Sequence, residues 1–110
     1  MPTGRILLRM KFEWDAQKNR TNIAKHGFDL SDSVEVFDLP MLVAPDTRED
    51  YGEQRFVGIG FLRQRIIVVV YAQQDDDTIR VISLRKALRH ERERFGQFLR
   101  DELGAGRSDD

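Results

Sequence analysis

The sequence predicts an α+β fold, in which a small antiparallel sheet of about four to five strands carries two short N-terminal helices and one C-terminal helix. Three apolar runs, at 55–62, 66–72 and 78–84, are separated only by "RQR" and "QQDDD". Connections this short join antiparallel neighbours. After Leu84 the apolar spacing changes to the 3.6-residue period of a helix. The 110 residues suffice for one small domain with a modest core.

The N-terminal residues divide into an extension and the start of the domain. Residues 1–9 show no periodicity, and we expect them to be loosely held. The next residues, "KFEW", alternate like a short strand. We therefore predict a single domain over 10–103, with a disordered tail at 104–110.

A first helix is predicted over about 16–26. Asp15 can cap its N-terminus, and Gly27 can take the left-handed conformation that ends it. Phe28 is then expected to fold back onto Ile23, the apolar contact that accompanies such an ending.

A second short helix and the sheet follow. Asp29 or Ser31 can cap this helix, and Pro40 ends it. The next run, "MLVA", reads as a brief strand. The run 66–72 is apolar at every position, so it is the expected central strand, covered on both faces.

The last helix is expected to begin after Leu84 and to end near Gly104. Arg85, Arg89 and Arg92 follow at i, i+4 and i+7 and would share one helix face. Guanidinium groups in such a row suit phosphates, because each is always charged and offers a planar fork of donors. The apolar stripe beside them would comprise Leu84, Leu88, Phe95, Phe98 and Leu99.

These arginines also permit a plain structural interpretation, a solvated face with pairs such as Arg89–Glu93 and Glu91–Arg94. Arg80 favours the functional one, since a charge inside a strand costs desolvation unless it faces a cleft, a partner or an acid. We expect Arg80 and the arginines of the helix to converge at one basic corner.

Composition excludes several classes of protein. A chain without cysteine has no disulfide framework, no thiolate nucleophile and no cysteine-based zinc site. No window reaches the roughly 18–20 apolar residues of a membrane span, so we expect a cytoplasmic protein with no membrane partner. No spacing typical of a metal or nucleotide site occurs, and we expect no cofactor and no metal.

Charge is divided along the chain although its net value is only −1. Residues 29–53 hold eight acids against one base, and residues 80–100 hold seven bases against two acids. This asymmetry favours an anionic partner for the basic surface, unless folding places the two segments against each other.

His26 and Lys25 stand at the predicted end of the first helix. Cations there are favoured by the helix dipole, and capping alone would explain both residues. The alternative is that His26 transfers a proton, since the unperturbed pKa of its side chain lies closest to neutrality. His90 is expected to be solvated.

Three blocks of the sequence together resemble the BrnT family of toxins from bacterial type II toxin–antitoxin pairs. They are "WDAQKNRTNIAKHG", "EQRF" and "RVISLRKALRHE", and the resemblance covers about residues 10–96. It implies a RelE-like endoribonuclease fold, held inactive by a BrnA-type antitoxin that also binds DNA. Phe95 departs from the family, because relatives commonly have a tyrosine there.

The resemblance implies metal-independent cleavage, in which the 2′-OH of the RNA attacks the adjacent phosphate. On this reading Arg80, Arg85 and Arg55 hold the phosphate and Ser83 donates a hydrogen bond to one of its oxygens. His26 or Lys25 serves as acid or base. The residues expected to bind the RNA backbone are Arg89, Arg92 and Lys86.

The implied partners are a BrnA-type antitoxin, an RNA substrate and, only through the antitoxin complex, operator DNA. The antitoxin is expected to mask the Arg80–Arg92 corner with acidic side chains around apolar anchors. A second hypothesis makes the chain a binding module without catalysis, which grips an acidic antitoxin or nucleic acid through its basic C-terminal face.

Overall fold

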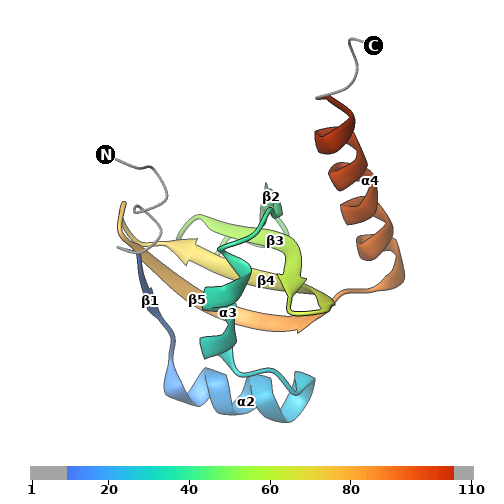
Figure 1. Ribbon diagram of the computed structural model, residues 1–110. Coiled ribbons are helices and arrows are strands. Elements are labelled where there is room, and N and C mark those ends of the chain that lie inside the picture. The colour runs from blue at the N-terminus through green and yellow to red at the C-terminus, as the bar shows by residue number, and fades with distance from the viewer. Residues whose placement is uncertain (1–9, 106–110) are drawn as a thin grey trace.

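The computed structural model describes residues 10–105, and the predictions for 1–9 and for 106–110 lie outside the described residues (Figure 1). The predicted α+β class is confirmed. In chain order the elements are β1 (Lys11–Glu13), α2 (Ala16–His26), a 3-10 helix η1 (Leu30–Asp32), α3 (Ser33–Val36), β2 (Leu42–Pro45), β3 (Arg55–Leu62), β4 (Arg65–Gln73), β5 (Thr78–Lys86) and α4 (Arg89–Ala105).

The five strands form one sheet in the order β1-β5-β4-β3-β2. The strands β2 to β5 pair antiparallel with their neighbours, as predicted. The exception is β1, which pairs parallel to β5, with Lys11 opposite Thr78 and Glu13 opposite Arg80. The antiparallel run leaves one side of β5 open, and β1 occupies the first part of this edge.

The two faces of the sheet carry separate cores. On one, here called the α3 face, η1 and α3 cover Ile67, Val69 and Tyr71 of β4. On the other, the α4 face, Phe95 of α4 packs in one cluster with Val68. The strand β4 is buried from both sides, which confirms its predicted central place.

The predicted caps of the first helix are confirmed. Asp15 Oδ1 accepts a hydrogen bond of 2.9 Å from the backbone N–H of Lys18. Gly27 has φ 77°, in the left-handed region, and its N–H donates to the carbonyl of Ile23 at 2.8 Å. Phe28 is buried in the core of the α3 face, whereas Ile23 remains 42% exposed.

The prediction that the last helix begins directly after Leu84 is wrong, because β5 continues to Lys86 and α4 begins at Arg89. Neighbouring groups provide hydrogen-bond partners for the extended backbone. The side-chain amide of the buried Asn22 bonds both the N–H and the carbonyl of Leu84, at 3.1 and 2.9 Å. Leu84 is therefore a core residue of the α3 face, and Leu88 is 55% exposed instead of joining an apolar stripe.

The helix α4 starts where Glu91 Oε1 accepts a 2.7 Å hydrogen bond from the N–H of Leu88. This bond satisfies one of the donors that a helix start leaves free. The helix runs to Ala105, one residue past the predicted end. None of the helices in residues 10–105 is long and apolar enough to cross a membrane.

Candidate active site

A β-bulge in β5 places three of the predicted site residues on one face of the sheet. The pairing register between β4 and β5 shifts at Val70–Tyr71, which leaves Ile82 as an extra residue. In a regular strand, Arg80 would face away from Ser83 and Arg85, because alternate residues point to opposite faces. The bulge reverses that alternation. All three therefore lie on the α4 face.

Arg55 and Arg80 form a pair across the sheet. Both stand opposite Ala72 of β4, one on each side. The Nε of Arg55 donates to Glu53 Oε2 at 3.0 Å, and Nη2 of Arg80 donates to the same oxygen. The ring of Tyr51 lies 4.1 Å from the guanidinium carbon of Arg55. Two guanidinium groups thus converge on one carboxylate oxygen.

The charge state of Glu53 follows from this arrangement. The hydrogen bonds from Arg55 and then Arg80 lower the pKa of the Glu53 carboxyl below its ordinary value. The group is therefore ionised at neutral pH and can accept a proton but cannot donate one. The two arginine side chains are 18% and 29% exposed, so the group remains open to a ligand.

Arg85 has a carboxylate partner of its own. Its two terminal nitrogens donate to the two oxygens of Glu91, both at 2.8 Å. This fork-to-fork geometry is the strongest form of ion pair. The side chain of Glu91 is only 12% exposed, and the hydrogen bonds from Arg85 are the largest cause that lowers the pKa of its carboxyl to about 2. The same interaction raises the pKa of Arg85.

His26 and Lys25 end α2 beside the last part of β5. The bonds of Asn22 to Leu84 hold the helix there. Partial burial lowers the pKa of His26, and the positive charges of Lys25 and Arg85 lower it further. His26 is therefore mostly neutral at pH 7, and it lies close enough to Arg85 for that charge to affect its pKa.

The structure does not gather the remaining predicted residues at the same place. Arg89 is 86% exposed and pairs with Glu93 of α4 at 3.4 Å. Lys86 lies at the end of β5, six residues beyond Arg80, which is roughly 20 Å along a strand. Arg92 belongs to α4. The expected single basic corner is therefore two groups of cations, and Arg85 is a strand residue that shares no helix face with Arg89.

Sequence reasoning missed the carboxylates that orient these arginines. Glu53 lies two residues before Arg55, a spacing that could have suggested a shared face, but its bond to Arg80 depends on sheet register. The plain structural interpretation of the helix offered Arg94 as a partner of Glu91, whereas Glu91 pairs with Arg85. Phe95 is fully buried 5.0 Å from the ring of Phe61, so it is a core residue here.

A metal would need several ligands close together. Within residues 10–105, no group of three or more His, Asp or Glu side chains is placed to hold a metal ion.

Comparisons with known proteins give consistent results. A model of the family described as the ribonuclease toxin, BrnT, of type II toxin–antitoxin systems matches residues 14–91. The crystal structure of the Brucella abortus ribonuclease toxin, BrnT, at 1.1 Å resolution has a TM-score of 0.61 and 36% sequence identity, and the match covers 73% of this chain and 99% of that one. No curated protein matches. The matched range includes every paired arginine of the α4 face.

Proposed function

The chain belongs to the BrnT family of ribonuclease toxins of type II toxin–antitoxin systems, and we propose that it is a metal-independent endoribonuclease that inhibits translation by cutting RNA. The observation that carries this proposal is the bulge, which turns Arg80, Ser83 and Arg85 to one face of the sheet. Beside them stand one ionised carboxylate and one imidazole.

We place the scissile phosphate over Ser83. The partners of Arg80, Ser83 and Arg85 on β4 are Ala72, Val70 and Val68, which are two residues apart in each case. The phosphate would thus lie roughly 7 Å along the strand from each arginine. The long side chains of Arg80 and Arg85 can reach it from the two directions along the strand. Arg55 would add a second guanidinium group on the side of Arg80. The hydroxyl of Ser83 would donate to a phosphate oxygen.

The two ends of this arrangement suit the two proton transfers of the reaction. When the 2′-OH attacks, its proton must leave, and the departing 5′-oxygen must gain one. Glu53, ionised and bonded to Arg80, would take the first proton. His26, or its neighbour Lys25, would supply the second from the side of Arg85. The guanidinium groups would stabilise the charge that develops on the phosphorus oxygens.

The chemistry of the products tests the proposal. Purified protein is incubated with RNA in EDTA, and the ends of the fragments are analysed. We expect cleavage that leaves a 2′,3′-cyclic phosphate and a 5′-hydroxyl, and no cleavage where the 2′-OH is replaced by hydrogen. Cleavage abolished by EDTA would refute metal independence. An RNA strand that is bound but stays whole would favour the non-catalytic binding module.

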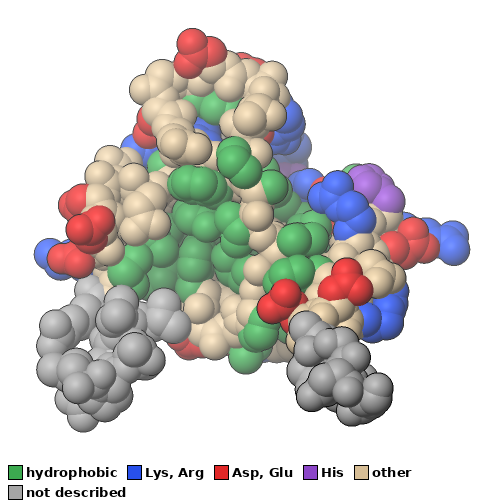
Figure 2. All heavy atoms as spheres, turned by 90° about the horizontal axis from the view of Figure 1, so that it is seen from above, with side chains coloured by type: hydrophobic (Ala, Val, Ile, Leu, Met, Phe, Trp, Pro, Cys, Tyr) green, Lys and Arg blue, Asp and Glu red, His purple; other side chains and the backbone are tan. Residues whose placement is uncertain are grey.

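We also propose that an antitoxin of the BrnA type covers an apolar surface, and that operator DNA is reached only through this complex. Hydrophobic side chains gather across the middle of one side of the molecule, with charged side chains at the rim (Figure 2). Among the described residues, Leu39 and Val43 are exposed apolar side chains, at 48% and 41%, and Val43 belongs to the edge strand β2. Contiguous apolar surface of this kind marks protein interfaces. Loss of antitoxin binding in Val43→Glu, with folding intact, would support this placement.

A further inference from the structure

A small cavity lies at the end of the sheet, outside the active site described above. Its volume is about 300 Å³, and it is lined by Gln64, Arg65, Ile66, Lys86 and Arg92. The three cations come from three different elements, namely the start of β4, the end of β5 and the first turns of α4. We call this cavity the Arg65 pocket.

The backbone that carries these cations is held firmly. Lys86 stands opposite Ile67 in the sheet, and the N–H of Ala87 donates to the carbonyl of Ile66 at 3.0 Å. Arg92 reaches back from α4, where its Nη1 donates to the carbonyl of Ala87 at 2.9 Å. These contacts hold the backbone of β4, β5 and the start of α4 close together, so the three cations line one cavity.

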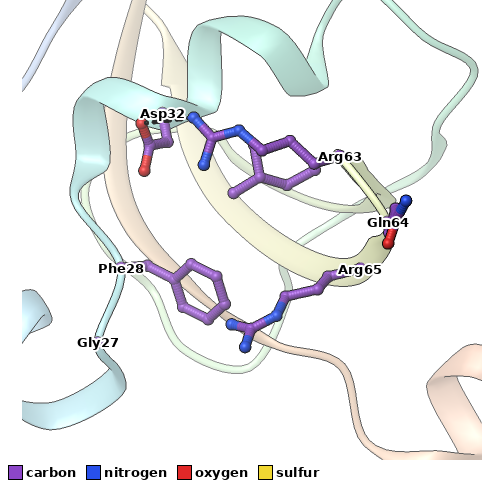
Figure 3. A pocket seen from close by; sticks show the side chains of 7 residues that line it. Gly27, Phe28, Asp32, Arg63, Gln64 and Arg65 are labelled. Atoms are coloured by element: carbon purple, nitrogen blue, oxygen red, sulfur yellow. Dashed lines mark hydrogen bonds and ion pairs between the residues drawn. The ribbon is translucent and has the colours of Figure 1, made fainter.

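Arg65 begins β4, directly after the connection from β3, and its side chain packs against Phe28. Its guanidinium carbon lies 5.6 Å from the centre of the Phe28 ring. Figure 3 looks into a neighbouring pocket, which shares Gln64 and Arg65 with this one, and shows the Arg65 side chain directed toward Phe28. Arg63 has φ 59°, a conformation that costs a non-glycine residue roughly 1–2 kcal/mol.

The three cations of the Arg65 pocket lack acidic partners among the described residues. Ion pairs within residues 10–105 involve Arg48, Arg55, Arg63, Arg80, Arg85 and Arg89, and none includes Arg65, Lys86 or Arg92. The neighbouring Arg63 shows the contrast, because Glu35 holds it at 2.8 Å. Like charges gathered around one cavity repel each other, and an anion that enters it removes that repulsion.

We propose that the Arg65 pocket binds a phosphate of the RNA strand that is not the phosphate being cleaved. This inference rests on the proposed function, which makes RNA the substrate. Lys86 follows Arg85 directly, and successive residues of a strand point to opposite faces. An RNA strand that leaves the α4 face past Arg85 and bends around the end of the sheet meets the pocket next.

The chemistry of the pocket favours a phosphodiester. Two arginines and one lysine line the cavity, and among the described residues no acidic side chain does. Such donors recognise the oxygens of a phosphate by charge and by hydrogen bonds. The contact would therefore contribute affinity without reading the base sequence.

Equilibrium binding to an uncleavable strand tests the pocket. The probe is a fluorescent 2′-O-methyl RNA, which has no 2′-OH to attack, and anisotropy is measured over a series of salt concentrations. The test variant carries Arg65→Gln, Lys86→Gln and Arg92→Gln. Its matched control loses the same charge elsewhere, through Lys11→Gln, Lys18→Gln and Arg20→Gln, all exposed residues of β1 and α2.

One phosphate neutralised on a single strand contributes about 0.7 to the slope of log K against log salt. We expect the slope of the test variant to fall by about 0.7, with binding at least about tenfold weaker at physiological salt, and the control to stay close to wild type. An unchanged slope and affinity in the test variant would overturn the proposal. So would intact RNA binding together with loss of antitoxin binding, because the pocket would then serve the antitoxin.

Two further measurements keep the result clear. If the triple variant does not fold by circular dichroism, the three single variants are measured, and each is expected to lower the slope by a part of this roughly 0.7. Cleavage of ordinary RNA by the wild-type protein is assayed in parallel. Absence of cleavage would refute the proposed function, and the binding data on the uncleavable strand would still decide whether the pocket holds phosphate.

Discussion

The two groups of cations differ in what neutralises them. On the α4 face, Arg80 and Arg85 are bonded to Glu53 and Glu91 before any ligand arrives. In the Arg65 pocket, no carboxylate of the described residues pairs with the cations. A ground-state phosphate must compete with a carboxylate in the first group and meets no competitor in the second. Paired arginines are therefore suited to the more negative transition state, and unpaired cations to binding.

This difference predicts a kinetic division. Interactions that strengthen only in the transition state raise kcat, whereas interactions equal in both states lower KM. Substitutions among the paired arginines should therefore reduce kcat. Substitutions in the Arg65 pocket should raise KM and leave kcat nearly unchanged.

The largest effect is expected from Arg80→Ala. Removing one preorganised donor from a developing charge typically costs a hundredfold to a thousandfold in rate, and we expect a fall in kcat of at least about a hundredfold. Single-turnover cleavage at saturating RNA measures it. Arg20→Ala, which removes an exposed arginine of α2, is the control and should cleave normally. A folded Arg80→Ala protein that cleaves RNA at the wild-type rate would contradict the assignment.

Glu53→Gln should separate binding from catalysis on the same face. The amide cannot take the proton of the 2′-OH, and general base catalysis is worth about a hundredfold or more. The substitution also frees Arg55 and Arg80 from their carboxylate, so the variant should bind the uncleavable RNA more tightly than wild type. Weaker binding together with normal cleavage would show that Glu53 only orients the arginines.

His26→Lys tests the imidazole apart from its helix end. Lysine places a cation at the end of α2, where the helix dipole favours positive charge, and we expect no loss of stability. The rate should fall by a few tens of fold, a modest loss because the lowered pKa of His26 already leaves most molecules without the proton at pH 7. Full activity would return His26 to a capping role.

The pH dependence of kcat/KM shows whether His26 acts as the acid or as the base. If His26 donates the proton, kcat/KM falls as the pH rises through its pKa in the free protein, which lies below 6.5. The negative charge of a bound phosphate raises the pKa of His26. In the pH profile of kcat, the corresponding fall should therefore appear at higher pH than in kcat/KM. A kcat/KM that rises through this range would make His26 the base.

Most of the fold could be predicted from the sequence, because its signals are local. The strand 55–62 and the caps at Asp15 and Gly27 depend on residues that are neighbours in the chain. The end of β5 could not be predicted, since its backbone is satisfied by Asn22, which is 62 residues away from Leu84. The apolar residues from Leu84 onward have helical spacing, and the predicted helix therefore included residues that belong to the end of β5.

The arrangement of the candidate site could not be predicted from the sequence. Arg80, Ser83 and Arg85 reach one face only through the bulge. No residue type in "RVISLR" indicates that a bulge occurs there. The carboxylate of Glu53 lies 27 residues from Arg80 in the chain and meets it through the sheet. Register decides both features, and register depends on pairing between distant segments.

Glu91→Gln should change stability more than catalysis. The folded pKa of Glu91, about 2, lies below the ordinary 4.5, so its ion pair with Arg85 stabilises the protein above pH 4.5. We expect the variant to lose roughly 2 kcal/mol of unfolding free energy at pH 7. Glutamine can still accept the N–H of Leu88, which preserves the start of α4.

Urea unfolding of both proteins at several pH values measures this contribution. As the pH falls from 4.5 toward 2, Glu91 becomes protonated and the difference between the two proteins should vanish. Asp46, whose pKa is also lowered to about 2, titrates in the same range in both proteins and cancels in the comparison. A difference that persists unchanged at pH 2 would place the role of Glu91 outside this ion pair.

The smallest effect is the one that separates two neighbouring arginines of α4. Arg92 lines the Arg65 pocket without an acidic partner, whereas Arg89 pairs with Glu93 at 86% exposure. Arg92→Gln should lower the salt slope of RNA binding by a part of the roughly 0.7 that one phosphate contributes, and raise KM a fewfold at unchanged kcat. Arg89→Gln removes the same charge one helical turn away and should leave both nearly unchanged, because Glu93 already neutralises it. Equal effects of the two substitutions would mean that the RNA responds to the total charge of α4, and the contrast between paired and unpaired cations would then lose its functional meaning.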